Sequence, residues 1–236
     1  MPDVIDRRHT PRGELVLRRA GDDFEVIANG VFLMDTRDGR SERALVREAI
    51  AGRSDVRLLL AGLGVGFSLD EALATDAVRE VVVVELEPAV VDWARTHLRG
   101  LTRHGLDDPR IRLVVSDLRD ALASFDGPFD AVCVDVDNGP GWLVHGQNAQ
   151  IYGDAGLSQL RDLLRPHGRL TVWAAAPDPP FEAALRRRFE HVRTVRFAVP
   201  RGPDDVVYVA MSSPARPLRP ESDAPIPGAV TERSTP

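Results

Sequence analysis

Residues 56–67 read Val-Arg-Leu-Leu-Leu-Ala-Gly-Leu-Gly-Val-Gly-Phe, and residues 81–87 read Val-Val-Val-Val-Glu-Leu-Glu. The first apolar run leads into Gly62, Gly64 and Gly66, and the second ends at Glu85. This pattern predicts a strand, a tight glycine turn, a helix, and a second strand tipped by a carboxylate. Such glycines leave room for a ligand against the backbone, and a carboxylate about 20 residues further on can accept hydrogen bonds from a ribose diol. We therefore expect a nucleoside-containing cofactor.

The spacing of the glycines distinguishes between two classes of cofactor. A dinucleotide fold places a third small residue three positions after the second glycine, and here that position is Phe67. The missing third glycine argues against a pyrophosphate at the start of the helix. A cofactor without phosphates, S-adenosylmethionine or a relative, fits better. A plain strand-to-helix connection is the alternative at this point.

Composition narrows the class of protein. The chain has 236 residues and no apolar run of membrane-spanning length, and residues 1–20 lack a signal-peptide pattern, so we expect a soluble cytoplasmic protein with no membrane partner. All 30 basic residues are arginine, which excludes a catalytic lysine. The net charge is −6 and the arginines are scattered among acids, so nucleic acid is not expected as a partner. Cys133 lies in an apolar run and is expected in the core.

Strand and helix signals predict an α/β fold. An Asn-Gly pair at residues 29–30 separates two apolar runs and indicates a hairpin, so residues 1–53 form a small N-terminal β-hairpin unit with a helix at 41–51. Residues 54–212 then alternate strands and helices, which predicts a doubly wound, mostly parallel seven-stranded sheet of the Rossmann-like methyltransferase type. Residues 213–236 are rich in proline and poor in large apolar groups, and are expected to be a disordered tail.

Acidic residues stand at the predicted carboxyl ends of three successive strands. They are Glu85, Asp117, and the pair Asp135 and Asp137. Ligands bind at this edge of an open α/β sheet. Glu85 suits the ribose hydroxyls and Asp117 suits the adenine amino group, although Asp117 could equally cap a helix. Asp135 and Asp137 are the candidate catalytic residues, since one carboxylate there can accept a proton from an attacking nitrogen.

The loop after the third of these strands is the candidate reaction centre. Residues 135–142 read Asp-Val-Asp-Asn-Gly-Pro-Gly-Trp, and the glycines and proline predict a rigid turn that a substrate can approach closely. The candidate substrate residues on this loop and the segment after it are Asn138, Trp142, His145 and Tyr152. No metal-ligand spacing of histidines and cysteines is present, so no metal is expected.

These residues resemble the spermidine synthase family, within the class I S-adenosylmethionine-dependent methyltransferase fold, over roughly residues 14–211. Residues 85–88, Glu-Leu-Glu-Pro, are similar to the family's Glu-Ile/Val-Asp segment, and Asp117 matches its adenine-side aspartate. Residues 135–140 are similar to its catalytic loop, and Tyr152 and residues 163–168 fit its pattern. The resemblance implies that Asp135 is the general base, that the substrate is a small amine, and that a homodimer forms through the N-terminal strands.

The chain also departs from the family's pattern. The family's glycine loop reads Gly-Gly-Gly-Asp-Gly-Gly, and Val65 replaces the aspartate that holds the amino end of decarboxylated S-adenosylmethionine. The tyrosine and acids that line the family's polyamine channel are not evident in residues 35–51, and the catalytic loop is about two residues shorter. Specificity for polyamines therefore does not follow from the resemblance.

Three hypotheses remain, and a nicotinamide oxidoreductase is disfavoured by Phe67. The main prediction is a transferase that uses S-adenosylmethionine to move a methyl or other alkyl group to a nitrogen nucleophile, with Asp135 as base. The first alternative is an aminopropyltransferase that uses decarboxylated S-adenosylmethionine and putrescine. The second is a non-catalytic nucleoside-binding protein, which would not need acids at the reacting end of the site.

Overall fold

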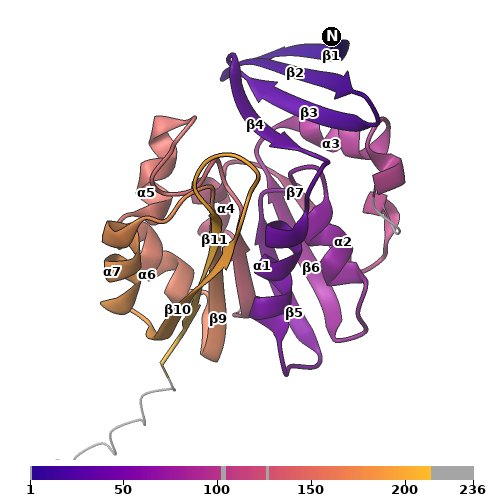
Figure 1. Cartoon of the computed structure of the whole chain (residues 1–236). Helices are drawn as coiled ribbons and strands as arrows, with labels where there is room; N and C mark the ends of the chain where they lie inside the picture. The colour runs from indigo at the N-terminus through magenta and orange to yellow at the C-terminus, as the bar shows by residue number, and fades with distance from the viewer. Residues whose placement is uncertain (1, 102–104, 126–127, 214–236) are drawn as a thin grey trace, which may run out of the picture.

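The computed structural model describes residues 2–101, 105–125 and 128–213, and contains two β-sheets (Figure 1). The predicted tail falls almost wholly outside these residues. The N-terminal sheet is antiparallel with the order β1-β2-β3-β4, from β1 (Asp3–Thr10), β2 (Gly13–Ala20), β3 (Asp23–Ala28) and β4 (Val31–Asp35). The Asn29-Gly30 hairpin is confirmed between β3 and β4, and both residues adopt positive φ there.

The N-terminal unit is larger than the predicted hairpin. Strand β1 was not expected, because its sequence Asp-Val-Ile-Asp-Arg-Arg-His-Thr lacks a continuous apolar alternation. It is an edge strand that pairs only with β2, and none of its residues is fully buried. Charged residues are common on such edges because they oppose pairing with another chain.

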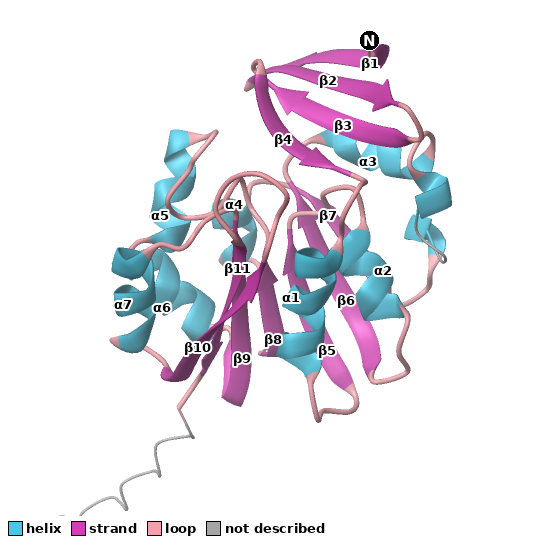
Figure 2. Cartoon of the chain, viewed as in Figure 1, coloured by secondary structure: helices cyan, strands magenta, loops and turns pink. Residues whose placement is uncertain are grey.

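The second sheet has seven strands in the order β10-β11-β9-β8-β5-β6-β7, as the α/β prediction requires (Figure 2). Strands β9, β8, β5, β6 and β7 run parallel, and β11 joins β9 and β10 antiparallel at one edge. The bounds are β5 (Val56–Ala61), β6 (Val78–Glu85), β7 (Ile111–Val115), β8 (Phe129–Val134), β9 (Leu164–Ala174), β10 (Glu190–Phe197) and β11 (Asp205–Met211).

Helices cover both faces of this sheet. On β5, Leu58 and Leu60 pack with one core cluster, and Leu59 and Ala61 pack with the other. The first cluster includes side chains of α1 (Arg40–Ile50), α2 (Phe67–Leu73) and α3 (Pro88–Arg95). The second includes side chains of α4 (Leu118–Leu122), α5 (Ala149–Tyr152), α6 (Asp154–Asp162) and α7 (Pro179–Arg186). A strand buried on both sides reads as a continuous apolar run, which is why β5 and β6 were recognisable in the sequence.

The N-terminal sheet lies over the carboxyl ends of the central strands (Figure 1). Trp93 of α3 donates a hydrogen bond from Nε1 to Asp6 of β1 at 2.9 Å, and Arg12 reaches Glu87 after β6 at 2.6 Å. Because ligands bind at the carboxyl edge of a doubly wound sheet, the N-terminal sheet closes the side of the expected site. Within the described residues, no helix is long and apolar enough to cross a membrane.

Candidate active site

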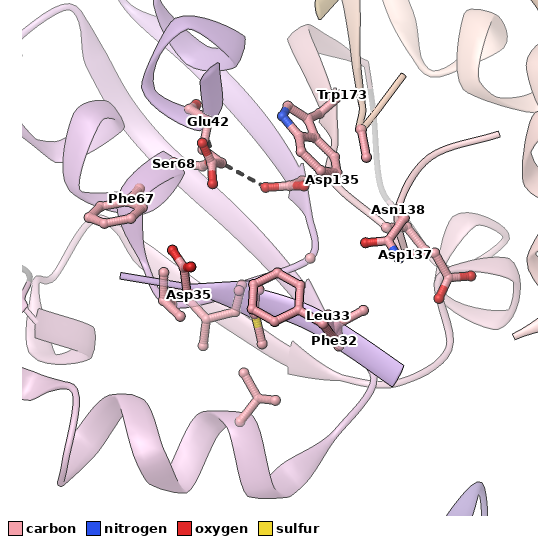
Figure 3. A pocket seen from close by; sticks show the side chains of 18 of the residues that line it. Phe32, Leu33, Asp35, Glu42, Phe67, Ser68, Asp135, Asp137, Asn138 and Trp173 are labelled. Carbon is pink, nitrogen blue, oxygen red and sulfur yellow. Dashed lines mark hydrogen bonds between the residues drawn. The ribbon is translucent and has the colours of Figure 1, made fainter. Parts of the chain in front are cut away.

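A cavity of about 720 Å³ opens at the carboxyl ends of β5, β6 and β8 (Figure 3). Residues of β4, including Phe32 and Met34, line one side, and residues 199–203 before β11 line another. The cavity contains the glycine loop and most of the predicted site residues: Gly62, Gly64, Gly66, Glu85, Asp117, Asp135, Asp137, Asn138, Trp142 and His145. The structure therefore brings these residues, which span more than eighty positions of sequence, to one place.

The glycine loop lies directly against the predicted catalytic loop, which begins at Asp135. Gly62 has φ +94°, and a Cβ built on it would overlap the carbonyl oxygen of Asp135. The backbone amide of Asp135 in turn donates to the carbonyl of Ala61 at 2.8 Å. Gly66 has φ +104° and starts α2 in a left-handed conformation that other residues rarely adopt. The first glycine is thus needed to seat Asp135, and the third to turn the chain into the helix.

The end of the cavity that is predicted to bind the nucleoside contains Glu85. Its side chain is buried, and its two oxygens accept hydrogen bonds from the amides of Leu63, at 2.9 Å, and Glu87, at 2.8 Å. Burial raises the pKa of Glu85 above its usual range. The carboxylate therefore joins the glycine loop to the end of β6.

Asp117 has a structural role at the start of α4. Its Oδ1 accepts a hydrogen bond from the amide of Arg119 at 2.9 Å, which caps the helix, and the Arg119 guanidinium contacts both carboxylate oxygens. Those contacts hold the pKa of Asp117 below its usual range. The helix-capping alternative is realised, while Asp117 still lines the cavity. Binding of adenine by Asp117 stays a prediction.

Asp135 lies in the cavity beside a second carboxyl group, that of Glu42 (Figure 3). Burial, followed by the charge of Glu42, raises the pKa of Asp135 to about 8. Ser68 Oγ lies 3.4 Å from Asp135 Oδ2. A carboxyl group whose pKa lies near neutrality is well matched to accept and return a proton.

Glu42 comes from the first turn of α1, and burial raises its pKa to about 7. Ser41 Oγ lies 2.7 Å from Glu42 Oε2 and 3.0 Å from Asp205 Oδ2, and it accepts a hydrogen bond from Trp173 Nε1 at 3.0 Å. A serine hydroxyl has one proton and can donate it to one carboxylate only. At least one of these acids must therefore be protonated or face a cation.

The acids of the family's polyamine channel are not evident in the sequence of residues 35–51, but this segment does contribute acids to the cavity. Asp35, Asp38 and Glu42 all line the cavity, as does Asp205 at the start of β11. Sequence reasoning missed them because the folding of α1 and β11 against β8 and β9, rather than any local motif, brings them to Asp135. The signal available was weak: an acid beside a serine at the start of a predicted helix.

Of the remaining predicted site residues, some line the cavity and Tyr152 packs behind it. Asp137 has φ +55°, and its Oδ2 accepts hydrogen bonds from Asn148 Nδ2 at 2.7 Å and from the amide of His145 at 3.3 Å, which fixes the turn at 145–148. Asn138 is buried, and Trp142 is 55% exposed at the rim. Tyr152 is buried outside the cavity lining and donates its hydroxyl to the carbonyl of Val136 at 2.6 Å, so it supports the catalytic loop from behind.

Cys133 is buried in the core as expected, and burial raises the pKa of its thiol to about 12, which excludes a thiolate nucleophile at neutral pH. In the part of the chain that the structure describes, no group of three or more His, Cys, Asp or Glu side chains is arranged to hold a metal ion.

Carboxyl groups outnumber arginines in the lining of the cavity. Among the described lining residues, nine carry carboxyl groups and two are arginines, Arg37 and Arg201. Arg37 is paired with Glu25 and Asp35, and arginines outside the lining pair with Asp38, Glu87 and Asp117. The nine acids are Asp35, Asp38, Glu42, Glu85, Glu87, Asp117, Asp135, Asp137 and Asp205. Such a cavity favours cationic ligands and disfavours anionic ones.

The fold and the cavity define a Rossmann-like protein with a glycine loop and an acidic cavity at the carboxyl edge of its parallel strands. A family model described as the spermine/spermidine synthase domain matches residues 48–176. A polyamine aminopropyltransferase of Mycobacterium tuberculosis is 32% identical over 200 residues, which cover 83% of this chain and 37% of that protein. The chain therefore belongs to the spermine/spermidine synthase family.

Other relatives agree with this assignment. A polyamine aminopropyltransferase of Aeropyrum pernix is 27% identical over 84% of this chain and 65% of its own length. Two solved structures share the fold with a TM-score of 0.71: spermidine synthase in complex with the transition state analogue AdoDATO, at 19% identity over 89% of this chain and 73% of that chain, and spermidine synthase from Thermotoga maritima, at 18% over 88% and 72%. The chain spans little more than a third of the length of the mycobacterial relative.

Proposed function

We propose that this protein is an aminopropyltransferase that uses decarboxylated S-adenosylmethionine and a small cationic amine. In this reaction the amine nitrogen attacks the carbon next to the sulfonium, the carbon–sulfur bond breaks, and methylthioadenosine leaves as a neutral thioether. Asp135 accepts the proton released by the nitrogen. The observation that carries the proposal is the pair of half-buried carboxyl groups, Asp135 and Glu42, which face one cavity whose lining has few cations.

Family membership and the cavity favour this alternative over the methyl or alkyl transfer that was the main prediction. Val65 does remove one carboxylate from the glycine loop, and the side chain is buried beside the cavity. Glu42 and Asp205, which lie on other elements, bring two further carboxyl groups to the same cavity. The carboxylate of ordinary S-adenosylmethionine would enter this acidic cavity against repulsion, whereas the decarboxylated form carries only an amino group at that end.

The carboxyl groups beside Asp135 are also suited to bind an acceptor that is an amine. Glu42, Asp205 and Ser41 form a polar cluster beside Asp135, and a primary ammonium group has three donors with which to satisfy it. A second ammonium on the acceptor could be held there while the first is deprotonated by Asp135. A diamine such as putrescine has both groups.

The test is release of methylthioadenosine from decarboxylated S-adenosylmethionine and putrescine. The wild-type protein should turn over, and Asp135→Asn should lose at least about a hundredfold in kcat, the typical contribution of a positioned base. Binding of methylthioadenosine by the variant, measured by calorimetry, should be retained. Equal turnover by both proteins would contradict the role of Asp135, and nucleoside binding without turnover by wild type would favour the non-catalytic alternative.

A further inference from the structure

A second carboxylate, that of Glu87, lines the cavity close to Glu85. Glu87 follows β6, and its side chain is 8% exposed. It occupies the N-cap position of α3, yet its side chain accepts no capping hydrogen bond from that helix. Helix capping therefore does not explain why this carboxylate is buried here.

Glu87 is held by the N-terminal sheet. Arg12, in the turn between β1 and β2, donates from Nε to Glu87 Oε1 at 2.6 Å and from a terminal nitrogen to the carbonyl of Leu86 at 3.1 Å. The charge of Arg12 also acts on Asp117 and Glu85. One arginine of the N-terminal sheet thus fixes both the backbone and the side chain of the segment that follows Glu85.

The other oxygen of this carboxylate is left without a partner. Glu87 Oε2 is buried and accepts no hydrogen bond within the described structure. A buried carboxylate oxygen without a donor is costly, and native proteins leave few of them. An ion pair that only tied the N-terminal sheet to the main sheet would not require this arrangement. A donor from a bound ligand would complete it, and Glu87 lines the cavity.

The neighbouring Glu85 indicates which donor is missing. Each of its oxygens already accepts one backbone amide, from Leu63 and from Glu87 itself, whereas Glu87 Oε2 accepts none. A ribose presents two vicinal hydroxyls, each of which can donate. We infer that Glu87, held by Arg12, is a second ribose-binding carboxylate, so that Glu85 and Glu87 each accept a hydrogen bond from one hydroxyl of the nucleoside. This inference rests on the proposed function.

The test compares methylthioadenosine with its 2′-deoxy and 3′-deoxy analogues by calorimetric titration of the full chain. In the wild type each deoxy analogue should bind about tenfold more weakly, because each loses a hydrogen bond to a charged acceptor. In Glu87→Leu one of the two analogues should bind within about threefold of the parent. Glu87→Gln keeps a hydrogen-bond acceptor and should retain part of the preference for methylthioadenosine over its deoxy analogues.

Variants of two arginines distinguish a role of Arg12 in ribose binding from a role in holding the N-terminal sheet against the main sheet. Arg12→Ala should reduce the difference in affinity between methylthioadenosine and its deoxy analogues, as Glu87→Leu does. Arg18→Ala is the matched control, because Arg18 is 36% exposed against 34% for Arg12, and it also pairs with a buried glutamate, Glu25, which does not line the cavity. It should leave the discrimination unchanged.

Discrimination in Glu87→Leu equal to that of the wild type, for both analogues, would overturn this inference while leaving the proposed function intact. Failure of the wild type to bind any of the three nucleosides would overturn both.

Discussion

At the scale of single residues, Glu42 is the clearest addition that the structure makes to the site. It lies on the first turn of α1, beside Asp135, and shares Ser41 with Asp205. Its side chain also lines the cavity. Its role under the proposed function is to bind the acceptor amine rather than to take the reacting proton.

Glu42→Gln should therefore raise KM for putrescine about tenfold or more and change kcat little, because a hydrogen bond to a charged group is lost from binding. Steady-state kinetics with decarboxylated S-adenosylmethionine at saturation measures both constants. Glu48→Gln is the control, since Glu48 lies on the same helix but pairs with Arg193. A variant that lost kcat with KM unchanged would assign Glu42 to the chemical step instead.

The raised pKa values of Asp135 and Glu42 make a second prediction, about stability in the ligand-free protein. Their pKa values are about 8 and about 7 in the folded chain, against about 4 in an unfolded one. Between pH 4 and pH 8 the folded state holds protons that the unfolded state has released. The free energy of unfolding should therefore fall as pH rises through this window.

Asp135→Asn removes the larger of these two effects. Relative to wild type, the variant should gain about 3 °C or more in Tm at pH 8 and nothing at pH 4, as measured by thermal unfolding without ligand. Asp22→Asn, in an exposed turn, is the control and should show no such trend. A difference in Tm that is the same at both pH values would contradict burial of an ionisable Asp135.

At the scale of elements, the contact between the glycine loop and the catalytic loop leaves no space for a side chain at Gly62. Gly62→Ala should lower the free energy of unfolding by about 3 kcal/mol or more, because it combines a positive φ with an overlap on the Asp135 carbonyl. Gly52→Ala separates the two causes, since Gly52 has φ +72° and open space around it, and should cost about 1 kcal/mol. Equal losses in urea unfolding would contradict the close approach of the two loops.

The sequence was most informative where the local pattern and the tertiary environment agree. Strands β5 and β6 are buried on both faces, so their apolar runs identified them, and the glycines and Glu85 identified the edge that binds ligands. Strand β1 was missed because its packing against β2, not its own pattern, makes it a strand. Strand β9 begins at Leu164 and continues through Pro166 and Gly168, which are turn signals in isolation.

The site was predictable only where a residue follows a strand of the parallel sheet. Asp135 and Glu85 were found in this way, since their position relative to the sheet fixes where they lie. Glu42, Asp205 and Arg12 were not, because their place in the site depends on how separate elements pack. Tyr152 shows the reverse case: its position on the chain suggested a substrate contact, and the packing of α5 directs its hydroxyl to Val136 instead.

At the scale of the whole molecule, the N-terminal sheet and the main sheet enclose one cavity with two distinct ends. Arg12 of the N-terminal sheet balances acids at the nucleoside end. The acids at the other end, Asp135, Glu42 and Asp205, face a cavity in which the described arginines are Arg37, already paired, and Arg201. This distribution of charge is the physical basis for expecting a ligand that is neutral at one end and cationic at the other. The homodimer suggested by the family resemblance stays a prediction, which light scattering of the full chain would test.

Under the proposed function, this cavity favours a cofactor whose amino end carries no carboxylate. Calorimetric titration of the wild-type chain with decarboxylated and ordinary S-adenosylmethionine tests it most directly. The account predicts that the decarboxylated form binds at least about tenfold more tightly, since about 1.4 kcal/mol of charge repulsion suffices for that preference. Equal or tighter binding of ordinary S-adenosylmethionine would contradict the account and return the protein to methyl or alkyl transfer.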